Sequence, residues 1–437
     1  DPWDGNRIGI SEQVPQPWVP MSTAQRNIVS CWGRDYAFRD SVLPEQIISL
    51  KEELLAAPIR IVGMAHDQPI EWSRQRMTIE SASDVEVRLT GSARSKYLEL
   101  RVRVAIEYDG MMRVDLDVAR TEDLTPLSAL ALEIPMPGER AVFIQNAQIS
   151  AFEHTGRRLD EKQGQLFGHS FLHNIWLGDH RRGLQWFAES DKEWHNGEGE
   201  PAMEVVRDGT TVKLLIHFIN DPDYLLDWPI HYTFGLHATP AKPVDPVKRR
   251  RFVLNNTGDP WFADYNAFAY LWPNLRLKPG DSGMKWFGFP EPLHPDQYRE
   301  FLQGYCRDRG WRPLLYVYQT TLGEQSPVLR YHYQWLLQPR WRYHVSERGL
   351  RGYDKTELDK GYMSPMTKIC VNLPSVRDYL VHAYAQFIRE YDIAGFYADH
   401  VQPFGCQSKA HAGGSCVYEV DGELHAPKKI FATREIY

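Results

Sequence analysis

The segment from Asn372 to Asp399 constrains the fold of this chain more than any other. It reads as an extended piece, an amphipathic helix that a capping box of Ser375 and Asp378 would start, and a short apolar strand over residues 395–399. The helix repeats apolar side chains at the spacing of one helical face, at Val376, Tyr379, Leu380, Ala383, Phe387, Ile388 and Tyr391. The strand has almost no charge before it ends on Asp399, which is typical of a parallel strand buried on both faces. Barrel enzymes hold catalytic groups at this end of their strands.

The second half of the chain alternates strand and helix patterns, which favours parallel pairing. Strands are predicted at residues 285–290, 313–318, 368–372 and 395–399, with an amphipathic helix at 295–309. These strands fit the first four of a (β/α)8 TIM-type barrel, so Asp399 would end the fourth strand and the rest of the barrel would lie past Tyr437. An open doubly wound sheet is the rival fold. No glycine-rich turn follows the first strand, which counts against that rival.

The first half of the chain predicts an antiparallel β-sandwich. Residues 98–107 alternate apolar and charged side chains, and after Asp109-Gly110 the same alternation resumes at 114–118, as in a two-residue hairpin with one wet face. A second hairpin is predicted around Asp208-Gly209. One short helix is expected at 44–57. Proline and basic residues between 238 and 260 mark the boundary, so the predicted domains are a sandwich over 1–245 and a partial barrel over 246–437.

Composition excludes several classes of function. The 437 residues carry a net charge of −7, and the one basic run, residues 248–251, is short and leads into an apolar strand, so nothing indicates nucleic acid as a partner. No apolar window is long enough to span a membrane. Neither a Gly-x-Ser-x-Gly motif nor a phosphate-binding loop occurs, and no cofactor is expected. The 14 Trp and 22 Tyr residues offer flat apolar faces that suit sugar rings, although most such side chains serve a core.

Asp399 is the first candidate for a catalytic residue. A carboxylate at a barrel mouth can act as a nucleophile, as a base or as the charge that stabilises an oxocarbenium-like or oxazolinium-like transition state. The alternative is an Asp that caps the following loop or pairs with an Arg. His400 is adjacent and could donate a proton or orient a substrate, although a lone His is more often a structural hydrogen bonder.

Residues near the other predicted strand ends would surround Asp399. Glu291, Tyr318 and Asn372 each follow or end a predicted strand, and Trp286 lies within the first one. A carboxylate, a phenol and an amide that converge on one mouth suit the hydroxyl groups of a sugar. These four residues are therefore predicted to bind a carbohydrate substrate.

Cys406, His411 and Cys416 follow Asp399 in a Gly- and Ser-rich loop. A disulfide between Cys406 and Cys416 would shape this loop if the protein is exported. Free thiols are the second interpretation. A metal site comes last, because no fourth ligand is visible nearby in the sequence and the spacing matches no familiar zinc motif.

Several motifs resemble the N-terminal sandwich region of proteins of glycoside hydrolase family 123. They are residues 15–20 (PQPWVP), 31–36 (CWGRDY), 43–47 (LPEQI), 54–60 (LLAAPIR), 174–179 (NIWLGD), 183–191 (GLQWFAESD) and 233–240 (TFGLHATP). The resemblance covers most of residues 10–245 and rests on extended, Trp-rich motifs.

The resemblance implies a β-sandwich followed by a (β/α)8 barrel that attacks glycosidic bonds. In that family an adjacent Asp-Glu pair acts on N-acetylgalactosaminides: the Asp stabilises the substrate's own acetamido group as nucleophile, and the Glu is the general acid and base. Asp399 matches the Asp, but the next residue here is His400. The general acid would therefore be His400, Glu291 or a carboxylate beyond Tyr437.

Three functions compete. The leading hypothesis is a glycoside hydrolase that degrades a polysaccharide or glycan and is secreted, periplasmic or on the cell surface, with its signal peptide out of view because the chain begins at Asp1. The second is a non-catalytic carbohydrate-binding or scaffold protein with a degenerate barrel site, which His400 in place of Glu would explain. The third is a polysaccharide lyase. It ranks last because no basic cluster near Asp399 would neutralise a uronate.

Overall fold

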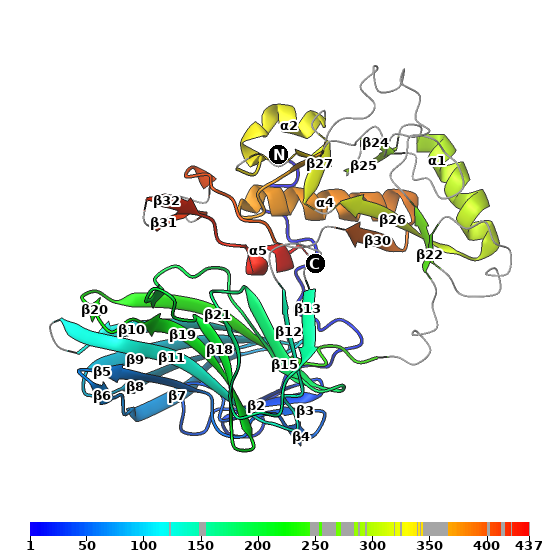
Figure 1. The fold of residues 1–437 in the computed structure, drawn as a ribbon. Helices are drawn as coiled ribbons and strands as arrows, with labels where there is room; N and C mark the ends of the chain where they lie inside the picture. Colours follow the sequence, from blue (N-terminus) through cyan, green and yellow to red (C-terminus); the bar gives the residue numbers. More distant parts are fainter. Residues whose placement is uncertain are drawn as a thin grey trace. The chain divides into compact units, whose positions relative to one another are not determined.

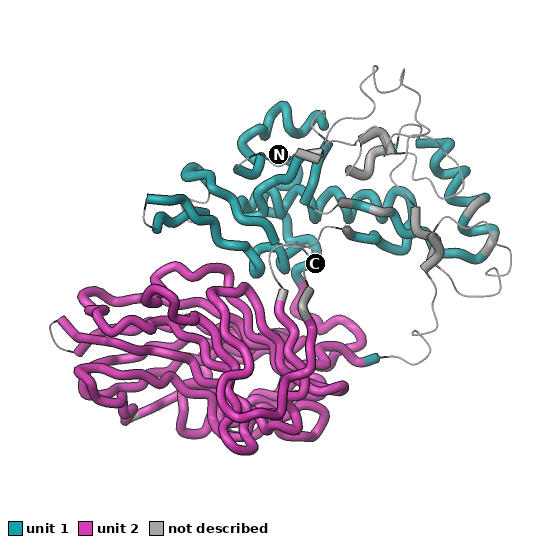
Figure 2. The backbone as a smooth tube through the Cα atoms, viewed as in Figure 1, with its two compact units in different colours: residues 1–10, 244–437 teal, residues 11–243 magenta. Residues whose placement is uncertain are grey.

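A computed structural model of the chain divides it into two compact units, residues 11–243 and residues 1–10 with 244–437 (Figure 2). The structure describes residues 1–121, 124–147, 154–244, 253–255, 268–271, 284–286, 289–292, 295–318, 320–323, 326–338, 340, 342–343, 366–399, 403–411, 416–420 and 422–436.

The unit of residues 11–243 is built from β-sheets that are antiparallel almost throughout (Figure 1). One sheet has the strand order β13-β12-β15-β16-β21-β10-β9-β8-β7. Its strands are β7 Ser73–Ala82, β8 Glu86–Arg94, β9 Leu98–Glu107, β10 Met111–Arg120, β12 Phe143–Ala147, β13 His154–Arg158, β15 Asn174–Gly178, β16 Gly183–Phe187 and β21 Ile230–Thr239.

A second large sheet has the order β14-β18-β19-β11-β5-β6, and two short strands, β17 and β20, pair with β19 and β11. Its strands are β5 Arg60–Ala65, β6 Gln68–Pro69, β11 Thr125–Pro137, β14 Gly164–His169, β17 His195–Asn196, β18 Met203–Asp208, β19 Thr211–Asn220 and β20 Leu225–Leu226. A small sheet joins β1 Ile28–Cys31, β2 Arg34–Ala37, β3 Gln46–Ser49 and β4 Glu52–Glu53.

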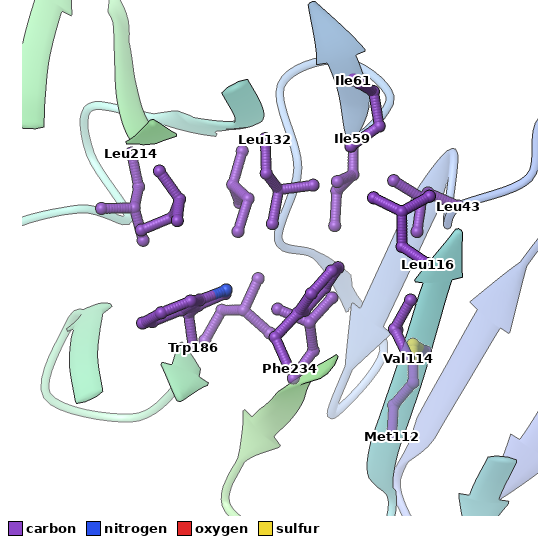
Figure 3. Packing of buried hydrophobic residues seen from close by; sticks show 14 of the residues in the cluster. Leu43, Ile59, Ile61, Met112, Val114, Leu116, Leu132, Trp186, Leu214 and Phe234 are labelled. Atoms are coloured by element: carbon purple, nitrogen blue, oxygen red, sulfur yellow. The ribbon is translucent and has the colours of Figure 1, made fainter. Parts of the chain in front are cut away.

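The core of this unit lies where apolar side chains of the large sheets meet (Figure 3). Trp186 and Phe234 come from one sheet, and Leu132 and Leu214 come from the other. The rings of Phe218 on β19 and Tyr232 on β21 stack with centroids 4.3 Å apart and an interplanar angle of 14°. The antiparallel sandwich predicted from the sequence is therefore confirmed.

The predicted hairpin of β9 and β10 forms, with Met112 opposite Ile106. Its buried and accessible positions alternate along both strands, as the pattern of charges predicts. The turn is longer than predicted, because three residues, 108–110, connect the strands and Gly110 adopts a φ of +82°. A glycine in the left-handed region is the usual device of a three-residue hairpin loop.

The prediction of a helix at 44–57 is wrong. This region forms β3 and β4, and the turn between them places Leu50 and Lys51 at φ values of 48° and 69°. The apolar residues there fit helical spacing, but Ile47 on β3 and Leu54, the residue after β4, reach the sandwich core instead. Ser49 donates a hydrogen bond to the carbonyl of Thr239 (2.9 Å). Tertiary contacts here override a local pattern.

The second unit contains a parallel sheet of order β22-β23-β26-β30. Its strands are β22 Val253–Asn255, β23 Phe268–Leu271, β26 Arg312–Tyr318 and β30 Gly395–Asp399. Around it the structure describes a hairpin of β24 Met284–Trp286 and β25 Phe289–Pro292, an antiparallel sheet of β27 Thr321–Gly323, β28 Arg342–Tyr343 and β29 Met366–Lys368, and a hairpin of β31 Tyr418–Val420 and β32 Glu423–His425.

Two of the four strands predicted for the barrel are wrong. Residues 313–318 and 395–399 do join the parallel sheet, but 285–290 enters the β24-β25 hairpin and 368–372 only begins with the end of antiparallel β29. The parallel sheet takes β22 and β23 instead. An apolar run shows that a segment can be a strand, but it does not show which strand will be its neighbour.

The helices of this unit include α1 and α4. Helix α1 spans Pro295–Phe301 and continues through a π turn, Leu302–Cys306, and a 3₁₀ turn, Arg307–Arg309, to Gly310, as predicted for 295–309. Helix α4 spans Pro374–Tyr391. The shorter helices are α2 Pro327–Tyr331 with a 3₁₀ turn at Tyr333–Trp335, and α5 Ile430–Arg434. None of the helices in the described residues is long and apolar enough to cross a membrane.

Helix α4 buries most of its predicted apolar face, although Ile388 remains 38% exposed. The predicted capping box is absent. The helix starts at Pro374, and Ser375 accepts a hydrogen bond from Nε1 of Trp335 (3.1 Å). Asp378 accepts the backbone N–H of Gly5 (2.8 Å). The two side chains therefore hold distant segments rather than the end of their own helix.

Helices α1 and α4 cover the same face of the parallel sheet. Tyr298 of α1 meets Tyr391 of α4 edge-on, with ring centroids 5.1 Å apart. Leu315 and Val317 of β26 belong to the same buried cluster. Because these two strand residues are two positions apart, they mark one face of β26 as the face under both helices.

Replacing Trp186 by Ala should destabilise the sandwich by about 3–5 kcal/mol, because it empties a fully buried site between the large sheets. Urea denaturation followed by circular dichroism measures this loss. Trp228, which is 63% exposed, provides the matched control, and Trp228→Ala should stay within about 0.5 kcal/mol of the parent. Equal losses in the two variants would contradict the packing described for Trp186.

Gly110→Ala should cost more stability than Gly209→Ala, although both glycines lie in hairpin turns at positive φ. Each alanine costs about 1–2 kcal/mol for the left-handed backbone. At Gly110 the new Cβ would also lie 2.8 Å from Cζ of Arg34, whereas nothing lies within 4 Å at Gly209. Arg34 is buried and donates to the carbonyls of Ala238 (3.1 Å) and Ala241 (3.2 Å).

Because Arg34 cannot move aside freely, the clash should add about 1–3 kcal/mol to the cost at Gly110. Denaturation of the two variants in parallel measures the difference. Indistinguishable midpoints would show that the Arg34 side chain relaxes without loss.

Candidate active site

Asp399 and Tyr318 lie side by side at one edge of the parallel sheet. Each is the last residue of its strand, and the register of β26 and β30 pairs Tyr318 with Asp399. Parallel strands that end together present the loops after them on the same side of the sheet, which is where open and closed α/β folds place their sites. The backbone thus brings together two of the residues predicted from the sequence.

The apolar sequence of β30 explains its place in the sheet. Phe396 and Ala398 pack against the cluster formed by α1, α4 and β26, and the Phe396 ring lies 4.7 Å from that of Tyr384 on α4. Tyr397, which lies between Phe396 and Ala398 in the strand, is 42% exposed. The strand therefore has one face under the helices and one face away from them.

Trp286 does not lie within a strand of the parallel sheet and Glu291 does not follow one, contrary to the prediction. Trp286 is on β24, opposite Phe289, and Glu291 is on β25, the second strand of the same hairpin. Strand β25 lies beside β26. The prediction failed because it treated residues 285–290 as one barrel strand, whereas that segment folds back on itself. His400 lies outside the described residues.

Asn372 also occupies a different place from the one predicted. It lies in the turn between β29 and α4, and its Nδ2 donates a hydrogen bond to Sγ of Cys416 (2.8 Å). The strand before it belongs to an antiparallel sheet, so Asn372 is not at a carboxyl end of the parallel sheet. Its amide is therefore bonded to the thiol of Cys416, in the loop after β30.

The predicted disulfide between Cys406 and Cys416 is absent, since both cysteines are free and buried. The sulfur of Cys406 lies 3.2 Å from Nδ1 of His411. Cys370 joins them: its Sγ, that of Cys406 and a ring nitrogen of His411 all lie within 4.8 Å of one another. The sulfur of Cys406 therefore contacts His411, and that of Cys416 contacts Asn372, in place of a bond between the two sulfurs.

The electrostatics of this cluster shift the pKa values of Cys406 and Cys370 in opposite directions. The pKa of Cys406 is lowered to about 5 by a hydrogen bond from Cys370, against the effect of burial, with further hydrogen bonds from the backbone of Gln338 and Ser408. The same contact with Cys406, together with burial, raises the pKa of Cys370. A thiolate at Cys406 next to a thiol at Cys370 is the arrangement that both shifts describe.

Sequence reasoning missed Cys370. It lies in an apolar run that the sequence pattern predicts only as a barrel strand, and it is far in sequence from Cys406. The available signal was the residue type alone, since cysteine is a soft ligand wherever it occurs. Only the pairing of the loops shows that Cys370 meets the other two.

Comparison with known proteins supports a relationship to glycoside hydrolases for part of the chain. Residues 22–197 match the family model described as "Glycoside hydrolase 123, third domain". The resemblance inferred from the sequence motifs is therefore confirmed for residues 22–197, which match a model of that family. No curated protein matches the chain.

Solved structures of α-galactosidases show a weak likeness. The α-galactosidase from Lactobacillus brevis is 13% identical over 86% of this chain and 61% of that chain, with a TM-score of 0.35. A GH36 α-galactosidase from Geobacillus stearothermophilus is 12% identical over 78% of this chain and 54% of that chain, with a TM-score of 0.34. This chain thus covers less than two thirds of either enzyme.

Proposed function

We propose that this chain belongs to a glycoside hydrolase that cleaves glycosidic bonds of a polysaccharide or glycan, with Asp399 as a catalytic carboxylate. The observation that carries the proposal is the register that ends β26 and β30 together, on Tyr318 and Asp399. The glycoside hydrolase family domain over residues 22–197 supports carbohydrate chemistry.

The topology of the second unit supports a barrel as the context of this site. The strands of its parallel sheet, β22, β23, β26 and β30, lie in the order of the sequence. A doubly wound sheet reverses its strand order at a switch point and carries helices on both faces. Here α1 and α4 share one face, as the helices of a (β/α)8 barrel do.

The strand period supports an active role for position 399. Residues two apart on a strand share a face, so position 399 falls on the face of Tyr397 and not on the face of Phe396 and Ala398, which pack under the helices. In a barrel the face away from the helices is the inner one, and its carboxyl end opens on the active site.

The proposed chemistry requires a carboxylate and an acid. Asp399 would stabilise positive charge at the reacting sugar, either directly or through a group of the substrate, and Tyr318 would hydrogen-bond a sugar hydroxyl. The leaving oxygen needs a proton from a second group. His400 and Glu291 are the candidates within this chain.

Asp399→Asn should lower kcat by at least about a hundredfold, because the amide keeps the shape but loses the charge. The measurement is the release of reducing ends from a glycan panel on which the parent protein is active. Asp392→Asn is the matched control, since Asp392 lies in the connection between α4 and β30, its side chain is 90% exposed, and asparagine tolerates its φ of 48°. That control should keep parental turnover.

Parental turnover in Asp399→Asn would refute the role of Asp399. Glycan binding without any release of reducing ends would favour the non-catalytic carbohydrate-binding alternative. An unsaturated product that absorbs in the ultraviolet would identify a lyase instead.

A further inference from the structure

Three cysteines and one histidine gather in the loops around the start of α4. Cys370, Cys406, His411 and Cys416 are 1%, 0%, 6% and 0% exposed. Cys370, Cys406 and Cys416 belong to one buried cluster with Leu337. Soft ligands enclosed together in this way are the composition of a structural zinc site, for which three Cys and one His is a common set.

The geometry of the cluster fits a single tetrahedral ion. Zinc lies roughly 2.3 Å from sulfur and roughly 2.0–2.1 Å from nitrogen, so ligand atoms around it are about 3.5–3.8 Å apart. The ligand atoms of Cys370, Cys406 and His411 all lie within 4.8 Å of one another, and the contact between Cys406 and His411 is 3.2 Å. Small side-chain rotations would therefore bring these atoms to metal-binding distances.

Cys416 is the fourth member of the set. Its thiol packs in the same buried cluster as Cys370 and Cys406, although the group whose ligand atoms all lie within 4.8 Å of one another consists of Cys370, Cys406 and His411. Cys416 is buried, and its sulfur accepts a hydrogen bond from Nδ2 of Asn372 at the border of the cluster. If a rotation of its side chain brings Cys416 to the ion, the four residues would supply the closed coordination that distinguishes a structural from a catalytic zinc site.

The sulfurs already have the hydrogen-bond donors that metal-bound thiolates receive. The backbone N–H of Gln338 donates to Sγ of Cys406 (3.4 Å), and Nδ2 of Asn372 donates to Sγ of Cys416 (2.8 Å). Donors of this kind orient ligands and stabilise their negative charge.

The cluster lies where several irregular segments meet. The backbone N–H of Gln407 bonds to the carbonyl of Gln338 (2.6 Å), and that of Cys370 bonds to the carbonyl of Trp335 (2.8 Å). Leu373 and Phe404 pack against the cluster. An ion here would join the segment before α4 to the loop that follows β30, the strand that ends on Asp399.

We propose that Cys370, Cys406, His411 and Cys416 bind one Zn²⁺ as a structural site. Binding is an acid-base and ligand-exchange step: the thiols that still carry protons release them to solvent, the sulfurs and one imidazole nitrogen donate electron pairs to the ion, and water leaves it. No oxidant is required. A disulfide between any two of the three cysteines would remove two of the four ligands, so the third thiol and the imidazole of His411 could not hold the ion alone.

The proposal does not depend on glycosidase activity, and its test uses metal content and thiol reactivity. The whole chain is purified without chelator, and bound metal is measured by elemental mass spectrometry. One zinc per chain is expected. Cobalt exchanged into the site should show sulfur-to-metal charge-transfer absorption and the visible bands of tetrahedral coordination.

Cys406→Ser and Cys370→Ser should each lower zinc content at least tenfold, because each removes one of the four ligands. Cys306→Ser is the matched control: Cys306 is also fully buried in this unit, but it lies in the separate cluster of Tyr298 and Leu315. It should keep one zinc per chain. Circular dichroism tests whether each variant is folded, and the parent's cobalt spectrum gives an answer even if a variant does not fold.

Three results would overturn the proposal. The first is a folded parent that binds neither zinc nor cobalt, while all five thiols react with a thiol reagent once the protein is denatured. The second is a parent with fewer reactive thiols after denaturation without reductant, which would show that a disulfide occupies the cluster. The third is unchanged zinc in both ligand variants, which would place the ion elsewhere.

Discussion

Burial of apolar side chains between antiparallel sheets is the constraint on which the larger unit depends. Trp186 and Phe234 from one sheet meet Leu132 and Leu214 from the other, and each such side chain contributes roughly 1.5–3 kcal/mol through its removal from water. Arg34 adds a polar constraint at the edge of this core. Its guanidinium donates to the carbonyls of Ala238 and Ala241, and the turn at Gly110 must leave room for it.

The smaller unit depends on a different arrangement, a parallel sheet covered by helices. Tyr298 and Tyr391 join α1 to α4, and Leu315 joins both helices to β26. This packing fixes the register of β26 against β30, and the register in turn sets Tyr318 beside Asp399. The proposed chemistry therefore rests on apolar contacts that take no part in it.

The thiol cluster would add a second constraint on the segments that flank α4 and β30. Cys406 lies in the loop after Asp399, and Cys370 precedes α4, whose C-terminal end leads into β30. An ion bound by both would join the segment before α4 to the loop after β30. Loops without regular structure often require such a link, because they bury little apolar surface of their own.

Local patterns in the sequence determined the elements whose partners are near in the chain. The alternation of residues 98–118 predicted a hairpin, and the apolar spacing of residues 374–391 predicted a helix and its buried face. The carboxylate at the end of residues 395–399 was visible for the same reason. Tertiary structure alone decided which strands pair. It turned residues 44–57 into strands, folded 285–290 into a hairpin and brought Cys370 to Cys406. Periodicity reports which face of a segment is apolar, whereas pairing depends on contacts between residues that are distant in the chain.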